Sequence, residues 1–269
     1  MKKWYYILAA LLLGACVGQK EDPEPEPVPD PVVDPEGGAA EGTIPFHRVL
    51  ALEFTATWCQ YCPNMTEALV EASAARPGRI VDIAVHQYDE LSNPDLYGIV
   101  DYFKAGSFPQ MVLDWDAGTM FNEQRAQRIL DYVDATVDKP TCNIALECSY
   151  ADQTLNAKVT VKADEAAAYS VTALLVQDLI LVEQAGYGSD YPCMGVLRQA
   201  LGSGTDGESL GNLQKDEEKS YTFQTALDTG ENPESDFRVV AFVRKDGRVV
   251  NAIEAGLNEK SDYAYEKDN

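Results

Sequence analysis

The sequence predicts an α/β domain followed by an all-β sandwich domain, and three observations support this fold class. Two cysteines in Trp58-Cys59-Gln60-Tyr61-Cys62-Pro63 lie between a short apolar segment and a segment with helical spacing. Residues 79–137 continue with strand-like and helix-like patterns in turn, as in a sheet covered by helices. From residue 141 onward apolar residues recur at every second position, which is typical of half-buried strands. We therefore expect an α/β domain over 44–140 and a β-sandwich domain over 141–258.

The cysteine pair follows a predicted strand and opens a predicted helix. Residues 48–54 are mostly apolar, and Met65, Leu69 and Ala72 then recur at helical spacing until Pro77-Gly78 ends the pattern. Unpaired backbone amides and the helix dipole favour a thiolate at the start of a helix. A second thiol one turn later lies close enough to form a disulfide. Cys59 is therefore expected to be the attacking thiolate and Cys62 the resolving thiol.

The elements after this helix complete the α/β unit. We expect a second strand over 79–85, a helix over 94–104, and a strand that begins after Pro109. A tight turn at 116–118 should lead into a short return strand over 119–121 and a closing helix over 126–137, which Pro140 ends. Right-handed crossovers make such an order a compact sheet covered on both faces.

This order, with its motifs, resembles the thioredoxin superfamily, so the first domain is expected to be thioredoxin-like. The resemblance places Glu53 where the family has a buried acid six residues before the first cysteine, although that acid is more often Asp. It also implies that Pro109 is the cis-proline that faces the disulfide. The resemblance adds Trp58 to the catalytic segment and makes Phe108, Gln60 and Tyr61 candidate substrate contacts.

Two of these assignments keep an alternative. A carboxylate buried under the helix would have a raised pKa and could relay the proton of Cys62. Glu53 could instead be a partly solvated residue at the end of a strand. Acidic residues are seldom buried unless they have a role, so both interpretations stay open. Pro109 could be an ordinary turn proline before an edge strand.

The first residues indicate export and anchoring. Lys2 and Lys3 precede an apolar stretch that is too short for a permanent membrane span, so residues 1–16 are predicted to be a signal. The segment ends in Leu13-Gly14-Ala15-Cys16, which resembles the bacterial lipobox, in which the cysteine is lipidated; a plain secretory signal is the alternative. Residues 17–43 are rich in Pro, Glu and Asp and are expected to form a disordered tether. We expect an outer-membrane lipoprotein that faces the periplasm or the cell surface.

Charge and composition narrow the set of partners. The chain has 21 basic and 44 acidic residues, a formal net charge of −23, which argues against nucleic acid and anionic membrane surfaces. Only two histidines occur, and a zinc site on Cys59 and Cys62 would need two further ligands. No metal and no cofactor are therefore expected. The expected partners are protein thiols or disulfides, and the membrane through the lipid anchor.

The second half reads as short strands without helical spacers. They are predicted over residues 142–150, 155–161, 171–181, 221–225, 237–243 and 249–253. This pattern suggests an antiparallel sandwich, for which an immunoglobulin-like arrangement is one option. Residues 184–213 form a long excursion that is either functional or loosely ordered, and residues 259–269 form a polar tail.

Three further cysteines, Cys142, Cys148 and Cys193, are candidates for a structural disulfide. Cys142 and Cys148 lie on one predicted strand, too far apart to bond to each other. Whichever of them forms a bridge is expected to pair with Cys193, and the choice between them stays open. The other would stay free, pair between molecules, or lie in the core.

The layout as a whole resembles the family called outer membrane protein 28. Residues 53–63 are similar to that family's usual segment, and Tyr191 to Arg198 occupy the place of a loop motif that ends in Val-Leu-Arg. The family often has His-Asn before that ending, which this chain lacks. The expected function is that of a cell-envelope thiol–disulfide oxidoreductase or isomerase acting through a mixed disulfide. The alternative is a surface-exposed binding or adhesion lipoprotein that uses the thioredoxin fold as a scaffold.

Overall fold

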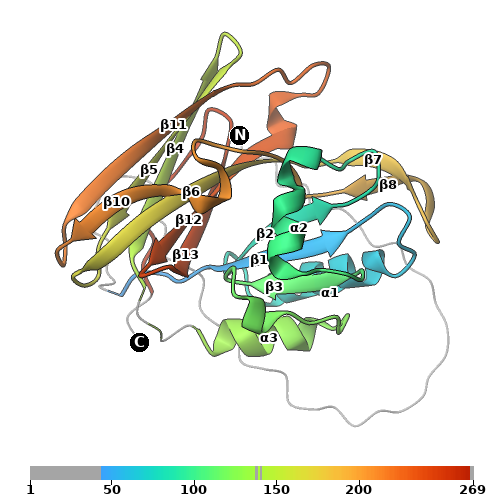
Figure 1. Ribbon diagram of the computed structural model, residues 1–269, viewed down its shortest axis with the longest axis horizontal. Helices are drawn as coiled ribbons and strands as arrows, with labels where there is room; N and C mark the ends of the chain where they lie inside the picture. The colour runs from blue at the N-terminus through green and yellow to red at the C-terminus, as the bar shows by residue number, and fades with distance from the viewer. Residues whose placement is uncertain (1–43, 137–138, 140, 267–269) are drawn as a thin grey trace.

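The computed structural model describes residues 44–136, 139 and 141–266, and it is mixed α/β with mostly strands and few helices (Figure 1). The predicted signal, Cys16, the tether, Pro140 and the last three residues lie outside the described residues. Within the described part, no helix is long and apolar enough to cross a bilayer.

The first half is built around the buried strand β1 (Val49–Thr55). β1 pairs in parallel with β2 (Ile80–His86) and antiparallel with β3 (Gln110–Leu113). α1 (Cys62–Ala75) joins β1 to β2, α2 (Tyr97–Phe103) joins β2 to β3, and α3 (Ala126–Asp134) follows β3. Apart from a return strand expected over 119–121, this order agrees with the strands and helices that the sequence predicts between residues 48 and 134.

The three helices cover both faces of the sheet, which explains why β1 is apolar at nearly every position. Val49 and Ala51 pack with side chains of α1 and α3, whereas Leu50, Leu52 and Phe54 pack with side chains of α2 on the other face. Successive side chains of a strand point to opposite faces, so a strand covered on both sides has no polar alternation. Glu53 is the exception, and it lies on the α1 face with Thr66.

The second half consists of strands with short turns. These are β4 (Asn143–Ala151), β5 (Thr154–Lys162), β6 (Ala167–Gln177), β7 (Ile180–Gln184), β8 (Gly188–Cys193), β9 (Val196–Ala200), β10 (Glu208–Leu213), β11 (Glu218–Ala226), β12 (Phe237–Lys245), β13 (Arg248–Gly256) and β14 (Lys260–Ser261). Short 3₁₀ turns lie at Pro94–Leu96, Ala117–Thr119, Gly204–Asp206 and Glu234–Asp236. A four-stranded sheet in the order β11-β5-β4-β14 faces part of a larger sheet across an apolar core, as in a sandwich.

The larger sheet runs through both predicted domains. Its eight strands follow the order β13-β12-β6-β9-β2-β1-β3, with β10 added to β6. The junction is β9, which pairs in parallel with β2 at Ala84–Val196 and antiparallel with β6. In Figure 1 the sandwich strands and the helix-covered strands therefore form one continuous body.

The strands at this junction bury both of their faces. In β6, Val171 and Ala173 point into the sandwich core, whereas Leu174 and Val176 point into the core that contains α2. β12 alternates in the same way between the two cores. Their sequences show continuous apolar runs because a second layer covers each face.

Two expectations about individual segments are wrong. Residues 119–121 form no strand: Asp116 caps the amide of Gly118 in a 3₁₀ turn, and only a single bridge joins Met111 to Phe121. The expected strand over 171–181 is two strands, β6 and β7, which belong to different sheets. The excursion over 184–213 holds β8, β9 and β10, so of its two alternatives the loosely ordered one is excluded and the functional one stays a prediction.

Candidate functional site

The two cysteines of the motif lie in the turn between β1 and α1, and a disulfide joins them. Their Cα atoms are 5.5 Å apart. The helix begins at Cys62, so Cys59 lies in the preceding turn rather than in the helix. The Cys59 amide donates to the carbonyl of Ala56 at 3.1 Å, and the Cys62 amide donates to the carbonyl of Cys59 at 3.3 Å. Pro63 follows in the first turn, where a missing amide hydrogen costs little.

The disulfide is buried beneath exposed side chains. Cys59 is 6% exposed and Cys62 is 1% exposed, so Cys59 is the more accessible sulfur. Trp58 and Tyr61, by contrast, are more than half exposed, and Gln60 is exposed as well. The exposed surface next to Cys59 is therefore largely aromatic.

Glu53 lies buried on the α1 side of β1, which confirms the buried interpretation over the solvated one. It is 2% exposed. The Thr66 hydroxyl donates to both carboxylate oxygens at 3.1 Å and lies 3.5 Å from the Cys62 carbonyl. Burial raises the pKa of Glu53 to about 8, the bond from Thr66 opposes this, and the charge of Asp82 adds to it. This carboxyl group can therefore gain and lose a proton near neutral pH.

Phe108 and Pro109 border the same site. The Phe108–Pro109 peptide bond is cis, as the sequence resemblance implied. Phe108 packs against the cluster of Ala56, Cys59 and Cys62, and its ring centroid lies 5.7 Å from that of Trp58. An open pocket of about 440 Å³ begins at Trp58 and Phe108 and continues to the exposed Tyr88. The pocket thus borders Trp58, the residue just before Cys59, and Phe108, which packs against the disulfide.

A hydrogen bond between the side chains of His86 and Asp89 supports the segment just before the cysteines. Asp89 accepts the Thr57 amide at 2.8 Å and lies 2.7 Å from Nδ1 of His86. Burial would raise the pKa of Asp89, but the bond and charge of His86 and the Thr57 amide hold it below its ordinary value. The motif predicted neither His86 nor Asp89, because they lie 24 and 27 positions after Cys62.

The β7–β8 hairpin also reaches this turn, which local sequence reasoning missed. The Gln184 side chain donates to the Cys59 carbonyl at 2.9 Å, and the Ala185 amide donates to the Thr57 carbonyl at 2.8 Å. A segment more than 120 residues away thus forms one wall of the site. The only sequence signal was the unusual length of the excursion that begins at Gln184.

The expected structural disulfide with Cys193 is wrong. Cys142, Cys148 and Cys193 are free and buried among the described residues. Cys142 and Cys148 lie in the core of the sandwich, whereas Cys193 lies in a separate cluster with Leu91, Val182 and Val196. Burial raises the pKa of Cys148 and of Cys193 to about 12 and raises that of Cys142 further. All three are therefore poor nucleophiles at neutral pH.

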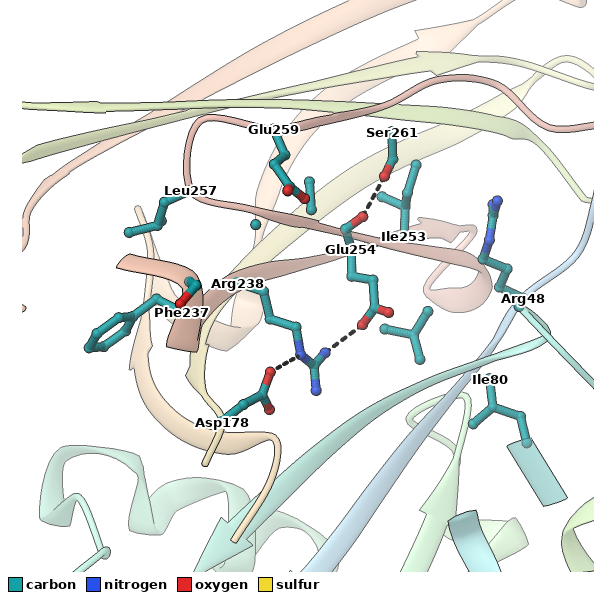
Figure 2. Close-up of a pocket in the computed structure, with 15 residues that line it drawn as sticks. Arg48, Ile80, Asp178, Phe237, Arg238, Ile253, Glu254, Leu257, Glu259 and Ser261 are labelled. Carbon is teal, nitrogen blue, oxygen red and sulfur yellow. Dashed lines mark hydrogen bonds and ion pairs between the residues drawn. The ribbon is translucent and has the colours of Figure 1, made fainter. Parts of the chain in front are cut away.

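A second pocket, of about 470 Å³, lies at the junction of the sheets and shares no residue with the cysteine site. Figure 2 shows its central guanidinium, Arg238, between Asp178 and Glu254, at 3.0 and 2.5 Å. Arg238 also contacts the carboxylate of Asp82 on β2 at 3.3 Å. The ion pairs of Arg238 thus link β2 to β12, β13 and the turn after β6, so this residue has a structural role in the pocket.

The ion pairs of Arg238 give a testable prediction about stability. Arg238→Leu should lower the free energy of unfolding by about 2 kcal/mol, because it leaves three carboxylates without their cation. The loss stays below that of a fully buried pair, since Asp82 and Glu254 are 34% and 44% exposed and can rehydrate. Arg125→Leu is the matched control: Arg125 is 76% exposed beside Glu123, and its loss should change stability by about 0.5 kcal/mol at most. Urea unfolding measures both, and equal effects would contradict the assigned role.

Comparisons with known proteins bear on the fold alone. No family model matches this sequence, and no curated protein compared with it is similar. Among solved structures, HBP35 of Porphyromonas gingivalis superposes with a TM-score of 0.66 at 20% identity, over 80% of this chain and 76% of that one. A protein of Agrobacterium tumefaciens superposes with a TM-score of 0.52 at 16% identity, over 78% of this chain and 94% of that one. The architecture therefore recurs in bacterial proteins of very different sequence.

Proposed function

We propose that this protein is a cell-envelope thiol–disulfide oxidoreductase that exchanges disulfides with protein substrates through Cys59 and Cys62. One observation carries the proposal: a disulfide closes the turn between β1 and α1, and Glu53 of β1 is buried against Thr66 of α1 with a pKa that burial raises to about 8. A buried acid costs stability, so its presence under the helix that follows the disulfide favours a chemical role over a structural one.

In the reducing direction, the Cys59 thiolate attacks one sulfur of a substrate disulfide. A bond forms between Cys59 and that sulfur, the substrate disulfide breaks, and the other substrate sulfur leaves as a thiolate that takes a proton from water. Cys62 then gives its proton to Glu53 and attacks Cys59, so that the Cys59–Cys62 disulfide forms and the second substrate thiol leaves. Two electrons pass from the enzyme dithiol to the substrate, and the reverse sequence oxidises a substrate dithiol.

Glu53 is suited to both directions because its pKa of about 8 lies close to neutral pH. In its ionised form it accepts the proton of Cys62, and in its protonated form it returns a proton to Cys62 as that sulfur leaves. Thr66 holds the carboxyl group through both oxygens and also lies beside the Cys62 carbonyl. The assignment of Glu53 to Cys62 rather than to Cys59 comes from the sequence resemblance, and these contacts place the carboxyl group against the helix that begins at Cys62.

The thioredoxin-like assignment of the first domain belongs to this proposal. It is supported by the element order β1, α1, β2, α2, β3, α3 with the cysteines between β1 and α1. Membership of the outer membrane protein 28 family and an outer-membrane lipid anchor on Cys16 are proposed from the sequence resemblances alone. Trp58, Phe108 and the pocket beside them are the proposed contact surface for an extended protein substrate.

Alkylation of the reduced protein with iodoacetamide tests the proposal without a known substrate. The rate of Cys59 alkylation should rise with pH with a midpoint at about 7 or below, because a reactive thiol at a helix start is acidic. In glutathione buffers the disulfide should form and open reversibly, at a potential between about −270 and about −120 mV. A midpoint near about 8.5, as in a free thiol, would contradict the proposal.

A further inference from the structure

The β7–β8 hairpin is fastened to the cysteine turn by a buried amide side chain. Gln184, the last residue of β7, is 3% exposed. Its Nε2 donates to the Cys59 carbonyl at 2.9 Å and to the Ala56 carbonyl at 3.3 Å. One amide group therefore binds both carbonyls that bracket the segment leading to the first sulfur.

The next three residues of the hairpin also lie close to the cysteine turn. The Ala185 amide donates to the Thr57 carbonyl at 2.8 Å. Gly186 has a φ of +85°, and a Cβ atom placed on it would lie 3.5 Å from Cβ of Gln60. The Tyr187 hydroxyl bonds to Asn64 and Glu67 in the first turns of α1, at 3.2 and 3.3 Å. The hairpin thus follows the turn from before Cys59 to beyond Cys62.

The buried face of the hairpin, which carries Gln184, also anchors it to the rest of the protein. Val182 of β7 and Cys193 of β8 are buried with Leu91 and Val196, and Tyr191 packs against them. Because this face is fixed in a core, Gln184 is held in place before any substrate binds. A preorganised donor costs no reorganisation during the reaction.

The two bound carbonyls matter for the charge on Cys59. A carbonyl oxygen carries partial negative charge, so it would destabilise a nearby thiolate if its peptide plane turned toward the sulfur. The Cys59 carbonyl also accepts the Cys62 amide at 3.3 Å, the contact that leads into the helix. A second donor on the Ala56 and Cys59 carbonyls, beside the Cys59 and Cys62 amides that already bond to them, offsets their negative charge and fixes both peptide planes.

We propose that Gln184 is a positioning residue for the redox reaction: by holding the Ala56 and Cys59 peptide groups, it allows the Cys59 thiolate to form at neutral pH. The inference rests on the proposed function of the cysteine pair and assigns part of its control to the hairpin. Gln184 does not touch the substrate; it acts through the backbone of Cys59.

The test uses the reduced full chain and iodoacetamide. Gln184→Met keeps the length of the side chain and removes the donor, so the midpoint of Cys59 alkylation should rise by about one pH unit, with a roughly tenfold lower rate at pH 6. Gln184→Glu keeps the shape and adds a negative charge, so its midpoint should rise further. Gln199→Met is the matched control, because its amide donates to Thr225 at 3.0 Å, between β9 and β11, and should leave the midpoint unchanged.

The outcomes separate this inference from the proposed function. An acidic midpoint in the wild type that is unchanged in both folded Gln184 variants overturns the role of Gln184 and leaves the function intact. A wild-type midpoint near about 8.5 overturns the function itself. Urea unfolding identifies a variant that does not fold, and the other Gln184 variant then decides the question.

Discussion

Cys62→Ser should convert the protein into a trap that retains its substrates as mixed disulfides on Cys59. The serine hydroxyl is not ionised at neutral pH, so it cannot attack the bond between Cys59 and the substrate. An intramolecular thiol acts at a high effective concentration, and its removal should slow release by about a hundredfold or more. Non-reducing electrophoresis and mass spectrometry of the trapped protein measure the adducts, which reductant should release.

The double variant Cys59→Ser, Cys62→Ser is the control, because it keeps the three other described cysteines. Cys142, Cys148 and Cys193 are buried with raised pKa values, so the double variant should form no adduct. Equal adducts in both proteins would show that the motif is not the reactive site. The absence of adducts in Cys62→Ser would favour the alternative in which the fold serves as a binding scaffold.

Glu53→Gln should make the oxidised protein more stable at alkaline pH. The pKa of Glu53 is raised from 4.5 in the unfolded chain to about 8 in the folded protein. Between these two pH values the folded protein holds a proton that the unfolded chain has released. The free energy of unfolding therefore falls as the pH rises through this range, by up to about 1.4 kcal/mol per pH unit. Glutamine does not ionise and can still accept the bond from Thr66. The variant should be within about 1 kcal/mol of the wild type at pH 5 and about 4 kcal/mol more stable at pH 9.

Urea unfolding of the disulfide form at the two pH values measures this difference. Glu71→Gln is the control, since Glu71 is a solvent-exposed carboxylate on α1, the helix that covers Glu53, and its replacement should not reproduce the pH-dependent difference. The same Glu53→Gln variant should resolve mixed disulfides about a hundredfold more slowly, because Cys62 loses its proton acceptor. A stability difference that does not change with pH would mean that Glu53 is ionised at neutral pH in the folded protein.

Most of the first half of the fold could be predicted because its signals are local. The apolar segment before the cysteines, the helical spacing after them and the Pro77-Gly78 stop place β1 and α1 correctly. The return strand at 119–121 failed because Asp116 binds the Gly118 amide and closes a turn in place of a strand. In the second half alternation located the strands, but it did not show which strands join two layers.

The candidate site, too, could be predicted only in part from the sequence. The spacing of Cys59 and Cys62 suggested a disulfide, and the position of Glu53 suggested an acid. Its burial, and therefore its pKa, depends on α1 and Thr66 closing over it. The sequence also paired Cys193 with a second-half cysteine, although the hairpin places it in a separate cluster.

By itself, the sequence determined where most strands and the three helices lie, which two thiols can bond, and that the chain is strongly acidic. These properties follow from the order and spacing of neighbouring residues. Only the tertiary structure decided that one sheet joins both halves, that Glu53 is sealed from water, and that Gln184 binds a carbonyl 125 positions away. Periodicity tells which face of an element is covered, whereas the identity of the covering segment depends on packing between parts of the chain that no local pattern connects.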